Sequence, residues 1–198
     1  MIHHIFGTHL HYFDIDSFEE DKILKYCYQE RKKDPKGVVK SNEGGWQSDS
    51  KGHNDSFVYS FIKQEVVNYY WNERCLREGV GLSLINMWIN INQKGDWNQG
   101  HHHPRCDLSG VLWIKTPENS GKLSFENPNS FALDNLLCCT TEEFKQQWGF
   151  YCTYKMTLKP GRIVLFPSHL VHRVEPSQSR QDRISISFNI NLEPPKDM

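Results

Sequence analysis

Hydrophobic and polar residues alternate strictly in two long stretches of the chain. In "GLSLINMWININ" (81–92), one side of the alternation carries Ile85, Met87, Ile89 and Ile91, and the other carries Asn86, Trp88, Asn90 and Asn92. In "RISISFNINL" (183–192), Ile184, Ile186, Phe188 and Ile190 alternate with Ser185, Ser187, Asn189 and Asn191. A period of two is the period of a β-strand, so both stretches are predicted to be strands with one apolar face.

Shorter strand signals lie between these two, and helical signals precede them. The shorter signals are "SGVLWIK", "GKLSFEN", "FYCTYKMTL", "GRIVLF" and "VHRVEP". The segment 17–33 opens with a capping box, Ser17 with Glu20, which predicts a helix start. Apolar residues from Ser56 to about Cys75 recur at helical spacing and predict a second helix. The segment 128–149 has no strand period, so a short helix or lid is expected there.

Two helices followed by about seven or eight short strands favour a mainly β fold with flanking helices, a β-sandwich or jelly roll. The expected organisation is one domain over 1–198. Within it, about 1–78 would form a helical N-terminal support with a loop, and about 79–194 the jelly-roll core.

Charge and cysteine usage exclude several classes of partner. The formal net charge is −1, from 23 basic and 24 acidic side chains, which gives no electrostatic basis for a nucleic-acid or membrane partner. None of the six cysteines forms a Cys-x-x-Cys pair, so reduced thiols in a cytoplasmic protein are expected. The N-terminus lacks the basic and apolar regions of a signal peptide, and neither a leader nor a membrane anchor is expected.

Three consecutive histidines, 101–103, stand just before a proline and an apolar strand. A purification tag would be longer and terminal, and a solvated surface patch is the ordinary alternative. A distant histidine, His172, favours a metal site instead. On a strand, His101 and His103 point to one side and His102 to the other. Together with His172 they would form a three-point facial clamp that leaves coordination positions open. His169, three residues before His172, is expected at the rim.

Arg183 and Ser185 share one face at the start of the last strand. A guanidinium fork with a hydroxyl beside it suits a carboxylate ligand. A salt bridge at the rim is the alternative interpretation of Arg183. Next to a metal clamp, the pair favours a site for the carboxylate of a cosubstrate.

Several blocks of the chain resemble a family of Fe(II)- and 2-oxoglutarate-dependent oxygenases known largely from marine bacteria and phages. The blocks are "SNEGGWQS" (41–48), "HHHPRCDLSGVLWIKTP" (101–117), "GKLSFENP" (121–128), "KPGRIVLFPSHLVHRV" (159–174) and "RISISFNI" (183–190). The opening "IFGTHLHYFDI" is also similar, and the resemblance covers nearly the whole chain. It extends more loosely to prolyl hydroxylases and aspartyl/asparaginyl β-hydroxylases.

The resemblance implies a double-stranded β-helix (a cupin-like jelly roll) that forms a single oxygenase domain. It implies Fe(II) on His101, His103 and His172, with Arg183 and Ser185 binding the distal carboxylate of 2-oxoglutarate. The implied reaction uses dioxygen to hydroxylate a peptide, an amino acid or a small molecule, with release of succinate and carbon dioxide. The wider superfamily has a carboxylate where this chain has His103, so Asp107 or a water could complete the site instead.

Two other functions and several secondary residues remain open at this point. A cupin-like three-histidine metalloenzyme would not use 2-oxoglutarate, and a non-catalytic jelly roll would be a binding module. Trp88, Asn90, Asn92 and Trp113 are candidate walls of the pocket, or else filling of the jelly roll. Trp46 is either a substrate contact in a loop over the opening or part of a structural cap. The N-terminal histidines, His3, His4, His9 and His11, are expected at the surface or in a second layer.

Overall fold

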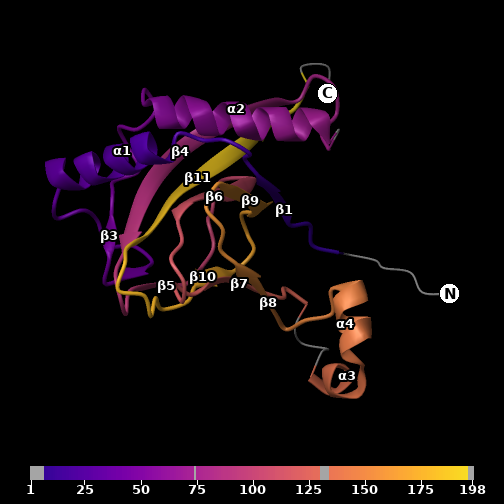
Figure 1. The fold of residues 1–198 in the computed structure, drawn as a ribbon. Coiled ribbons are helices and arrows are strands. Elements are labelled where there is room, and N and C mark those ends of the chain that lie inside the picture. Colours follow the sequence, from indigo (N-terminus) through magenta and orange to yellow (C-terminus); the bar gives the residue numbers. More distant parts are fainter. Residues whose placement is uncertain (1–6, 74, 130–133, 196–198) are drawn as a thin grey trace.

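The computed structural model describes residues 7–73, 75–129 and 134–195, which form two antiparallel β-sheets flanked by helices (Figure 1). The larger sheet contains, in spatial order, β1 (His11–Asp14), β9 (Arg162–Pro167), β6 (Leu108–Lys115), β11 (Arg183–Glu193), β4 (Gly81–Asn92) and β3 (Trp46–Gln47). The smaller sheet contains β2 (Asn42–Glu43), β5 (Trp97–His101), β10 (His172–Val174), β7 (Lys122–Glu126) and β8 (Thr153–Thr157). The predicted mainly β fold with flanking helices, a jelly roll, is confirmed.

Two helices cover the outer face of the larger sheet, α1 (Glu20–Lys33) and α2 (Phe57–Asn72) (Figure 1). The hydroxyl of Ser56 caps α2 by accepting a hydrogen bond from the amide of Tyr59, at 3.1 Å. The predicted capping box of α1 is wrong. Its N-cap is Glu19, without a side-chain cap, and acidic side chains in the first turn stabilise the positive end of the helix dipole instead.

The core beneath the helices is built from the alternating faces of the two long strands. Ile184, Ile186, Phe188 and Ile190 are fully buried there, as the alternation predicts. The prediction for β4 is wrong at one position. Ile85 is 38% exposed, and its neighbour Leu84 packs into the core. The reason is a bulge, because Asn189 pairs with Asn86 while the next residue of β11 pairs with Leu84.

A second apolar cluster fills the space between the two sheets. Its buried members are Val111, Trp113, Leu123, Phe125, Met156, Val164, Phe166 and Leu170. These come from strands of both sheets and from the turn before β10, so the cluster holds the sheets face to face. It also forms the apolar floor of the site described below.

The segment 41–48 is part of the sheets rather than a loop over an opening. Trp46 is buried in the core beneath the helices, and its indole Nε1 donates a hydrogen bond to the carbonyl of Asp34 at 2.8 Å. Gly44 and Gly45 have positive φ and turn the chain between β2 and β3. The hypothesis that Trp46 contacts the substrate is therefore wrong, and the structural role is correct.

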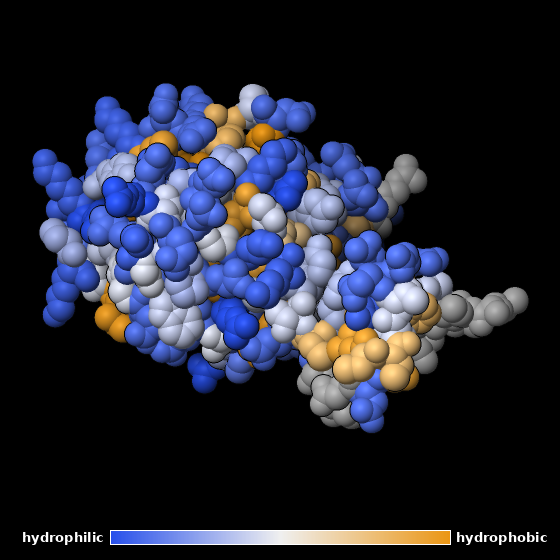
Figure 2. Space-filling view, turned by 60° about the horizontal axis from the view of Figure 1, so that its bottom comes forward, coloured by the Kyte–Doolittle hydropathy of each residue, from blue (hydrophilic) through white to orange (hydrophobic). Residues whose placement is uncertain are grey.

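A small helical lobe projects from the edge of the smaller sheet between β7 and β8. It contains α3 (Asp134–Cys139) and α4 (Glu142–Trp148), as expected for a segment without strand period (Figure 1). Gly149, at φ 63°, ends α4 in the left-handed conformation. Figure 2 shows hydrophobic side chains gathered on this projecting lobe.

Within the described part of the chain, no helix combines the length and the apolar character needed to cross a bilayer.

Candidate metal centre

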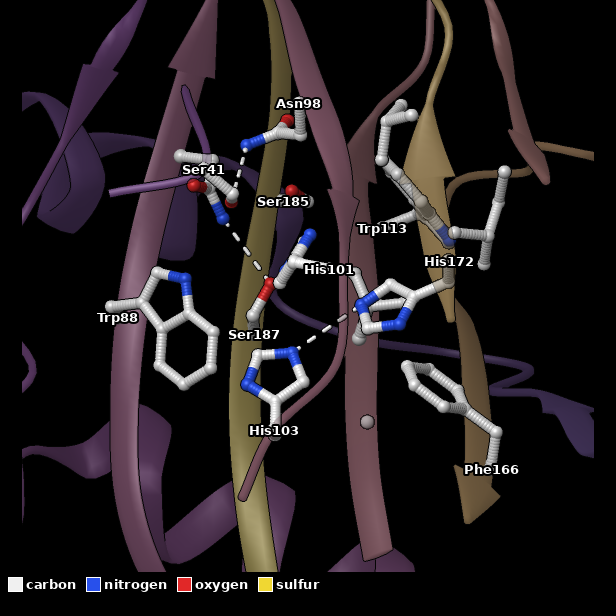
Figure 3. Close-up of a pocket in the computed structure, with 15 residues that line it drawn as sticks. Ser41, Trp88, Asn98, His101, His103, Trp113, Phe166, His172, Ser185 and Ser187 are labelled. Carbon is white, nitrogen blue, oxygen red and sulfur yellow. Dashed lines mark hydrogen bonds between the residues drawn. The ribbon is translucent and has the colours of Figure 1, made fainter. Parts of the chain in front are cut away.

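Three histidines converge on one side of a small cavity between the two sheets (Figure 3). His101 is the last residue of β5 and His172 the first of β10, and the two are direct partners in the antiparallel pairing. His103 lies two residues beyond β5, where its amide donates a hydrogen bond to the carbonyl of Ser168 at 2.9 Å. The sheet thus brings together residues about 70 positions apart in the sequence.

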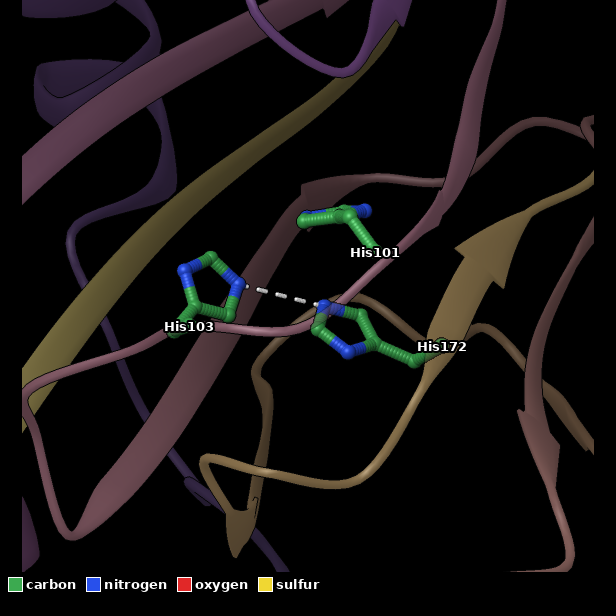
Figure 4. Close-up of side chains that lie close together, drawn as sticks. All are labelled: His101, His103 and His172. Atoms are coloured by element: carbon green, nitrogen blue, oxygen red, sulfur yellow. Dashed lines mark hydrogen bonds between the residues drawn. The ribbon is translucent and has the colours of Figure 1, made fainter.

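The three imidazoles are close enough to share one metal ion (Figure 4). One nitrogen from each ring lies within 4.8 Å of the other two, and the Nε2 atoms of His103 and His172 are 3.3 Å apart. Metal–nitrogen bonds of about 2.1 Å put neighbouring ligand atoms about 3 Å apart, so a small inward movement of the rings would suffice. In the described residues, this is the group of histidine, cysteine and carboxylate side chains that could hold a metal.

Backbone carbonyls orient two of the rings. The Nδ1 of His101 lies 2.7 Å from the carbonyl of Gln99, and the Nδ1 of His172 lies 3.0 Å from the carbonyl of Leu170. A carbonyl only accepts, so each Nδ1 carries the hydrogen and each Nε2 keeps its lone pair. Such a contact is the usual support of a metal-binding histidine.

Burial keeps the cluster uncharged at neutral pH. Desolvation, followed by the neighbouring histidines, lowers the pKa of His103 to about 4. Desolvation and the positive charge that His101 would carry lower the pKa of His172 to about 3. The pKa of His101 is also lowered, mainly by burial. Neutral imidazoles are the metal-binding form, so no proton has to leave before an ion binds.

The metal-free protein is expected to lose stability in mild acid. The pKa values of His103 and His172 lie below the ordinary 6.5 in the folded state, so from pH about 6.5 down to about 4 the unfolded chain takes up protons that the folded chain refuses. The free energy of unfolding should therefore fall as the pH falls through this window. Denaturant titrations of the apoprotein at several pH values measure this slope. His172→Asn should flatten it and His169→Asn should not, and equal slopes would contradict the assignment.

The other candidate metal ligands lie outside the histidine cluster. His102 and His169 are both exposed, outside the cluster. Asp107, the alternative to His103, is also exposed, and its carboxylate accepts a hydrogen bond from the amide of Leu192 at 2.8 Å. The structure does not bring Asp107 to the histidines.

Arg183 and Ser185 lie on the face of β11 that looks toward the smaller sheet. Arg183 is 1% exposed, and its Nη1 donates to the carbonyls of Ser120 and Glu175, the latter at 2.9 Å. Its Nη2 is buried with no hydrogen-bond partner. Desolvation lowers the pKa of Arg183 to about 10, which leaves the guanidinium charged at neutral pH. The charge of Asp96 partly offsets this effect on the pKa, but a buried guanidinium with an unpaired nitrogen is still costly.

A glycine makes room for this arrangement. Gly121 has φ +87°, and a Cβ atom there would lie 2.4 Å from the carbonyl oxygen of Glu175 and 3.1 Å from Nη1 of Arg183. Any larger residue would push against the carbonyl that fixes the guanidinium. Gly121 therefore leaves room for Nη1 of Arg183 to bind the carbonyl of Glu175, whereas Nη2 has no partner.

The cavity itself has a volume of about 40 Å³ and joins the histidines to Ser185 (Figure 3). Of the predicted wall residues, Trp88, Asn90 and Trp113 line it, and Asn92 does not. The indole Nε1 of Trp113 is buried without a partner, like the Nη2 of Arg183. Arg183 itself lies one step further along the same face of β11, beyond the lining residues.

Sequence reasoning missed three polar residues of the cavity. Ser41, Asn98 and Ser187 line it, with the amide of Asn98 3.4 Å from the hydroxyl of Ser41. The strand alternation of β11 could have indicated Ser187, which shares the face of Ser185. Ser41 and Asn98 meet through pairing of distant segments, for which the sequence carries no local signal.

His9 and His11 do not line the cavity. His9 is exposed, and the Nδ1 of His11 lies 3.1 Å from the hydroxyl of Tyr69 on α2. His3 and His4 lie outside the described residues.

Comparison with known families shows to which family the chain belongs. Residues 86–189, just over half of the chain, match the sequence pattern of a family described as "Putative 2OG-Fe(II) oxygenase". The chain belongs to the 2OG-Fe(II) oxygenase family. This oxygenase uses Fe(II) and 2-oxoglutarate, and acts on a substrate together with dioxygen, so the expected family, enzyme class and cofactors are confirmed. No curated protein matches the sequence.

Solved structures share the fold of this oxygenase at low sequence identity. A viral collagen prolyl hydroxylase from Paramecium bursaria Chlorella virus-1, in complex with 2OG, is 12% identical with a TM-score of 0.60, over 95% of this chain and 98% of that one. HygX from Streptomyces hygroscopicus, with nickel, 2-oxoglutarate and hygromycin B, is 11% identical with a TM-score of 0.62, over 96% and 84%. A Trichoplax adhaerens prolyl hydroxylase, with a peptide of the hypoxia-inducible factor, is 13% identical with a TM-score of 0.58, over 92% and 83%. The confirmed jelly roll is thus the fold of these oxygenases.

Proposed function

We propose that His101, His103 and His172 hold the Fe(II) of this oxygenase as a centre of three neutral histidines. The observation that carries the proposal is the convergence of their ring nitrogens within 4.8 Å. The residues fit the ion because imidazole suits iron, and because three ligands on one side leave positions for the cosubstrate and for dioxygen. With no carboxylate in the set, the protein does not offset the charge of the ion, which strengthens its attraction for the dianionic cosubstrate.

Arg183, Ser185 and Trp113 would hold the distal carboxylate of 2-oxoglutarate. Two buried donors without partners, Nη2 of Arg183 and Nε1 of Trp113, support this assignment. Ser185 pairs with Trp113 across the strands, and Arg183 lies two residues before Ser185 on the same face of β11. A carboxylate within reach of these donors would give them the partner they lack.

The mechanism follows from these placements. When bound, the Fe(II) and 2-oxoglutarate pair supplies the oxidising chemistry that hydroxylates the substrate with dioxygen and yields succinate and carbon dioxide. The donors at Arg183, Ser185 and Trp113 would hold the distal carboxylate of the cosubstrate, and its keto acid end would be left for the ion at the histidines. Phe125 and Phe166 pack against the His172 ring, with centroids 6.2 and 4.6 Å away, and exclude water from that side.

The substrate is proposed at the level of class: a peptide, an amino acid or a small molecule that becomes hydroxylated. Peptide-binding and hygromycin-binding proteins of the same fold support this range. We further propose one oxygenase domain over 1–198, supported by the core that α1 and α2 share with the larger sheet. Residues before 79 also contribute β1, β2 and β3 to the sheet edges. Six free cysteines support work in a reducing compartment such as the cytoplasm.

An anaerobic titration tests the proposed function. Fe(II) followed by 2-oxoglutarate should produce a weak visible charge-transfer band, because the keto acid chelates the ion. Fe(II) alone should not produce it. A folded protein that binds Fe(II) but gives no band with 2-oxoglutarate would instead indicate a three-histidine metalloenzyme that does not use this cosubstrate.

Trp113→Phe should weaken 2-oxoglutarate binding by about tenfold, because a donor to a charged group is lost while the packing of the ring is kept. The measurement is the concentration of 2-oxoglutarate that half-saturates the band. Affinity for Fe(II) should stay unchanged, since Trp113 is not one of the histidine ligands. Unaltered half-saturation would remove Trp113 from the carboxylate site.

A further inference from the structure

One buried serine joins the two segments that carry His103 and His172. Ser168 lies in the turn between β9 and β10, two residues before Leu170, and is 6% exposed. The carbonyl of Leu170 orients the His172 ring, so this turn already supports one of the proposed ligands. The connection between β5 and β6, which carries His103, is hydrogen-bonded to the same turn.

Ser168 makes three hydrogen bonds to that connection. Its carbonyl accepts from the amide of His103 at 2.9 Å, and its amide donates to the carbonyl of Asp107 at 3.0 Å. Its hydroxyl donates to the carbonyl of Cys106. The first two bonds use the backbone and would be kept by most residue types. The bond to Cys106 needs the hydroxyl, so it is the part of the contact that depends on a serine.

The segment 103–106 is a turn that includes a strained residue. Pro104 stands at its second position, and Arg105 at its third has φ 69°. This is the pattern of a type II turn, whose third position is usually glycine, because a Cβ atom is crowded at positive φ. A strained residue keeps such a conformation only where its surroundings hold it there. The hydroxyl of Ser168 holds the carbonyl of Cys106, the residue next to Arg105.

The ring of His103 depends on this backbone more than the other two rings do. Carbonyls orient the rings of His101 and His172, whereas among the described residues the ring of His103 has no such partner. It packs instead between the rings of Trp88 and His172, with centroids 5.5 and 5.1 Å away (Figure 4). Stacking alone leaves a ring free to slide, so the place of His103 is set by the turn that begins with it.

We propose that Ser168 is a positioning residue of the metal centre. Its hydroxyl keeps the turn 103–106 closed against the turn before His172, and thereby keeps the His103 ring within ligand distance of the His172 ring. This inference rests on the proposed function of the three histidines. It predicts that the loss of one hydroxyl, which contacts no metal, weakens metal binding.

The test compares Ser168→Ala with Ser48→Ala in the full chain. Ser48 is 3% exposed, and its hydroxyl contacts the amide of Ile89 and the ring of His53, away from the three histidines. Isothermal titration with Mn(II) should show affinity about tenfold lower for Ser168→Ala, as the loss of a group that supports a ligand does. Ser48→Ala should leave the affinity unchanged. Thermal unfolding of the metal-free proteins measures the structural cost of each substitution separately.

Arg105→Gly provides a rescue that a merely structural role of Ser168 would not predict. Glycine adopts a positive φ without strain, and Arg105 is exposed, so its replacement removes no buried contact. In the Ser168→Ala background, Arg105→Gly should recover part of the lost Mn(II) affinity. In the unmodified background it should change the affinity little.

Each contrary outcome has a distinct meaning. Unchanged Mn(II) affinity in folded Ser168→Ala, or an equal loss in Ser48→Ala, would overturn the inference and leave the proposed function standing. Ser168→Cys keeps the shape with a weaker donor and should lose affinity to a smaller degree under reducing conditions. Unchanged affinity in that variant would overturn the inference even if Ser168→Ala did not fold. Absence of metal binding by the unmodified chain would reject the proposed function itself.

Discussion

His172→Ala is expected to abolish the charge-transfer band of the anaerobic Fe(II) and 2-oxoglutarate complex, and with it the formation of succinate. His172 is buried, is the ladder partner of His101, and lies nearest to His103 through its Nε2. Its removal leaves two ligands and a gap beside Phe125 and Phe166. Loss of a contact that merely supports a ligand costs about 10–100-fold in metal affinity, so loss of the ligand itself should exceed about a hundredfold.

The matched control is His169→Ala, three residues earlier in the same segment. His169 is exposed and lies outside the cluster, so its removal should leave the band and the turnover unchanged. Circular dichroism would show that both variants are folded. Isothermal titration with Mn(II), which does not oxidise in air as readily, would measure metal affinity independently of turnover. A folded His172→Ala protein that still gives the band would remove His172 from the centre.

Arg183→Lys is expected to raise the apparent KM for 2-oxoglutarate about a hundredfold, with Fe(II) affinity preserved. The positive charge remains, but the planar fork is lost, and that fork lets Nη1 bind two carbonyls while Nη2 stays free. Lysine can reach the carbonyls or the cosubstrate, not both. Breaking a buried, hydrogen-bonded charge pair costs about 2–5 kcal/mol, which covers the expected effect.

Arg180→Lys is the control for that variant, since Arg180 is exposed in the loop before β11. The half-saturating concentration of 2-oxoglutarate, read from the band, separates binding from turnover. An Arg183→Lys protein with ordinary affinity for 2-oxoglutarate and reduced affinity for Fe(II) would show that Arg183 supports the histidines rather than the cosubstrate.

Regular alternation allowed much of the fold to be predicted from the sequence. The period of two in β11 placed its isoleucines in the core and Ser185 on the opposite face, which lines the cavity. Where the hydrophobic alternation predicted the wrong orientation, the cause is the pairing of strands that are distant in the sequence. The bulge opposite Asn189 turns Ile85 outward, and a bulge leaves no mark in the hydrophobic pattern.

Part of the candidate site could likewise be predicted from the sequence, and part could not. The spacing of His101 and His103, and the distant His172, predicted a cluster that the structure brings together. The burial of Trp46 depends on the carbonyl of Asp34, twelve residues away, and could not be predicted from its polar neighbours. Ser41 and Asn98 reach the cavity through the pairing of β2 with β5, which depends on contacts that only the folded chain makes.

The three histidines differ in how the chain holds them, and this difference bears on the proposed centre. His101 and His172 are joined by the sheet and form a fixed pair before any ion arrives. His103 sits beyond the strand, in a connection that bends through Arg105 at positive φ and is tied by its amide to Ser168. Two of the proposed ligands would therefore be positioned by strand pairing, and the position of the third would depend on the connection between β5 and β6.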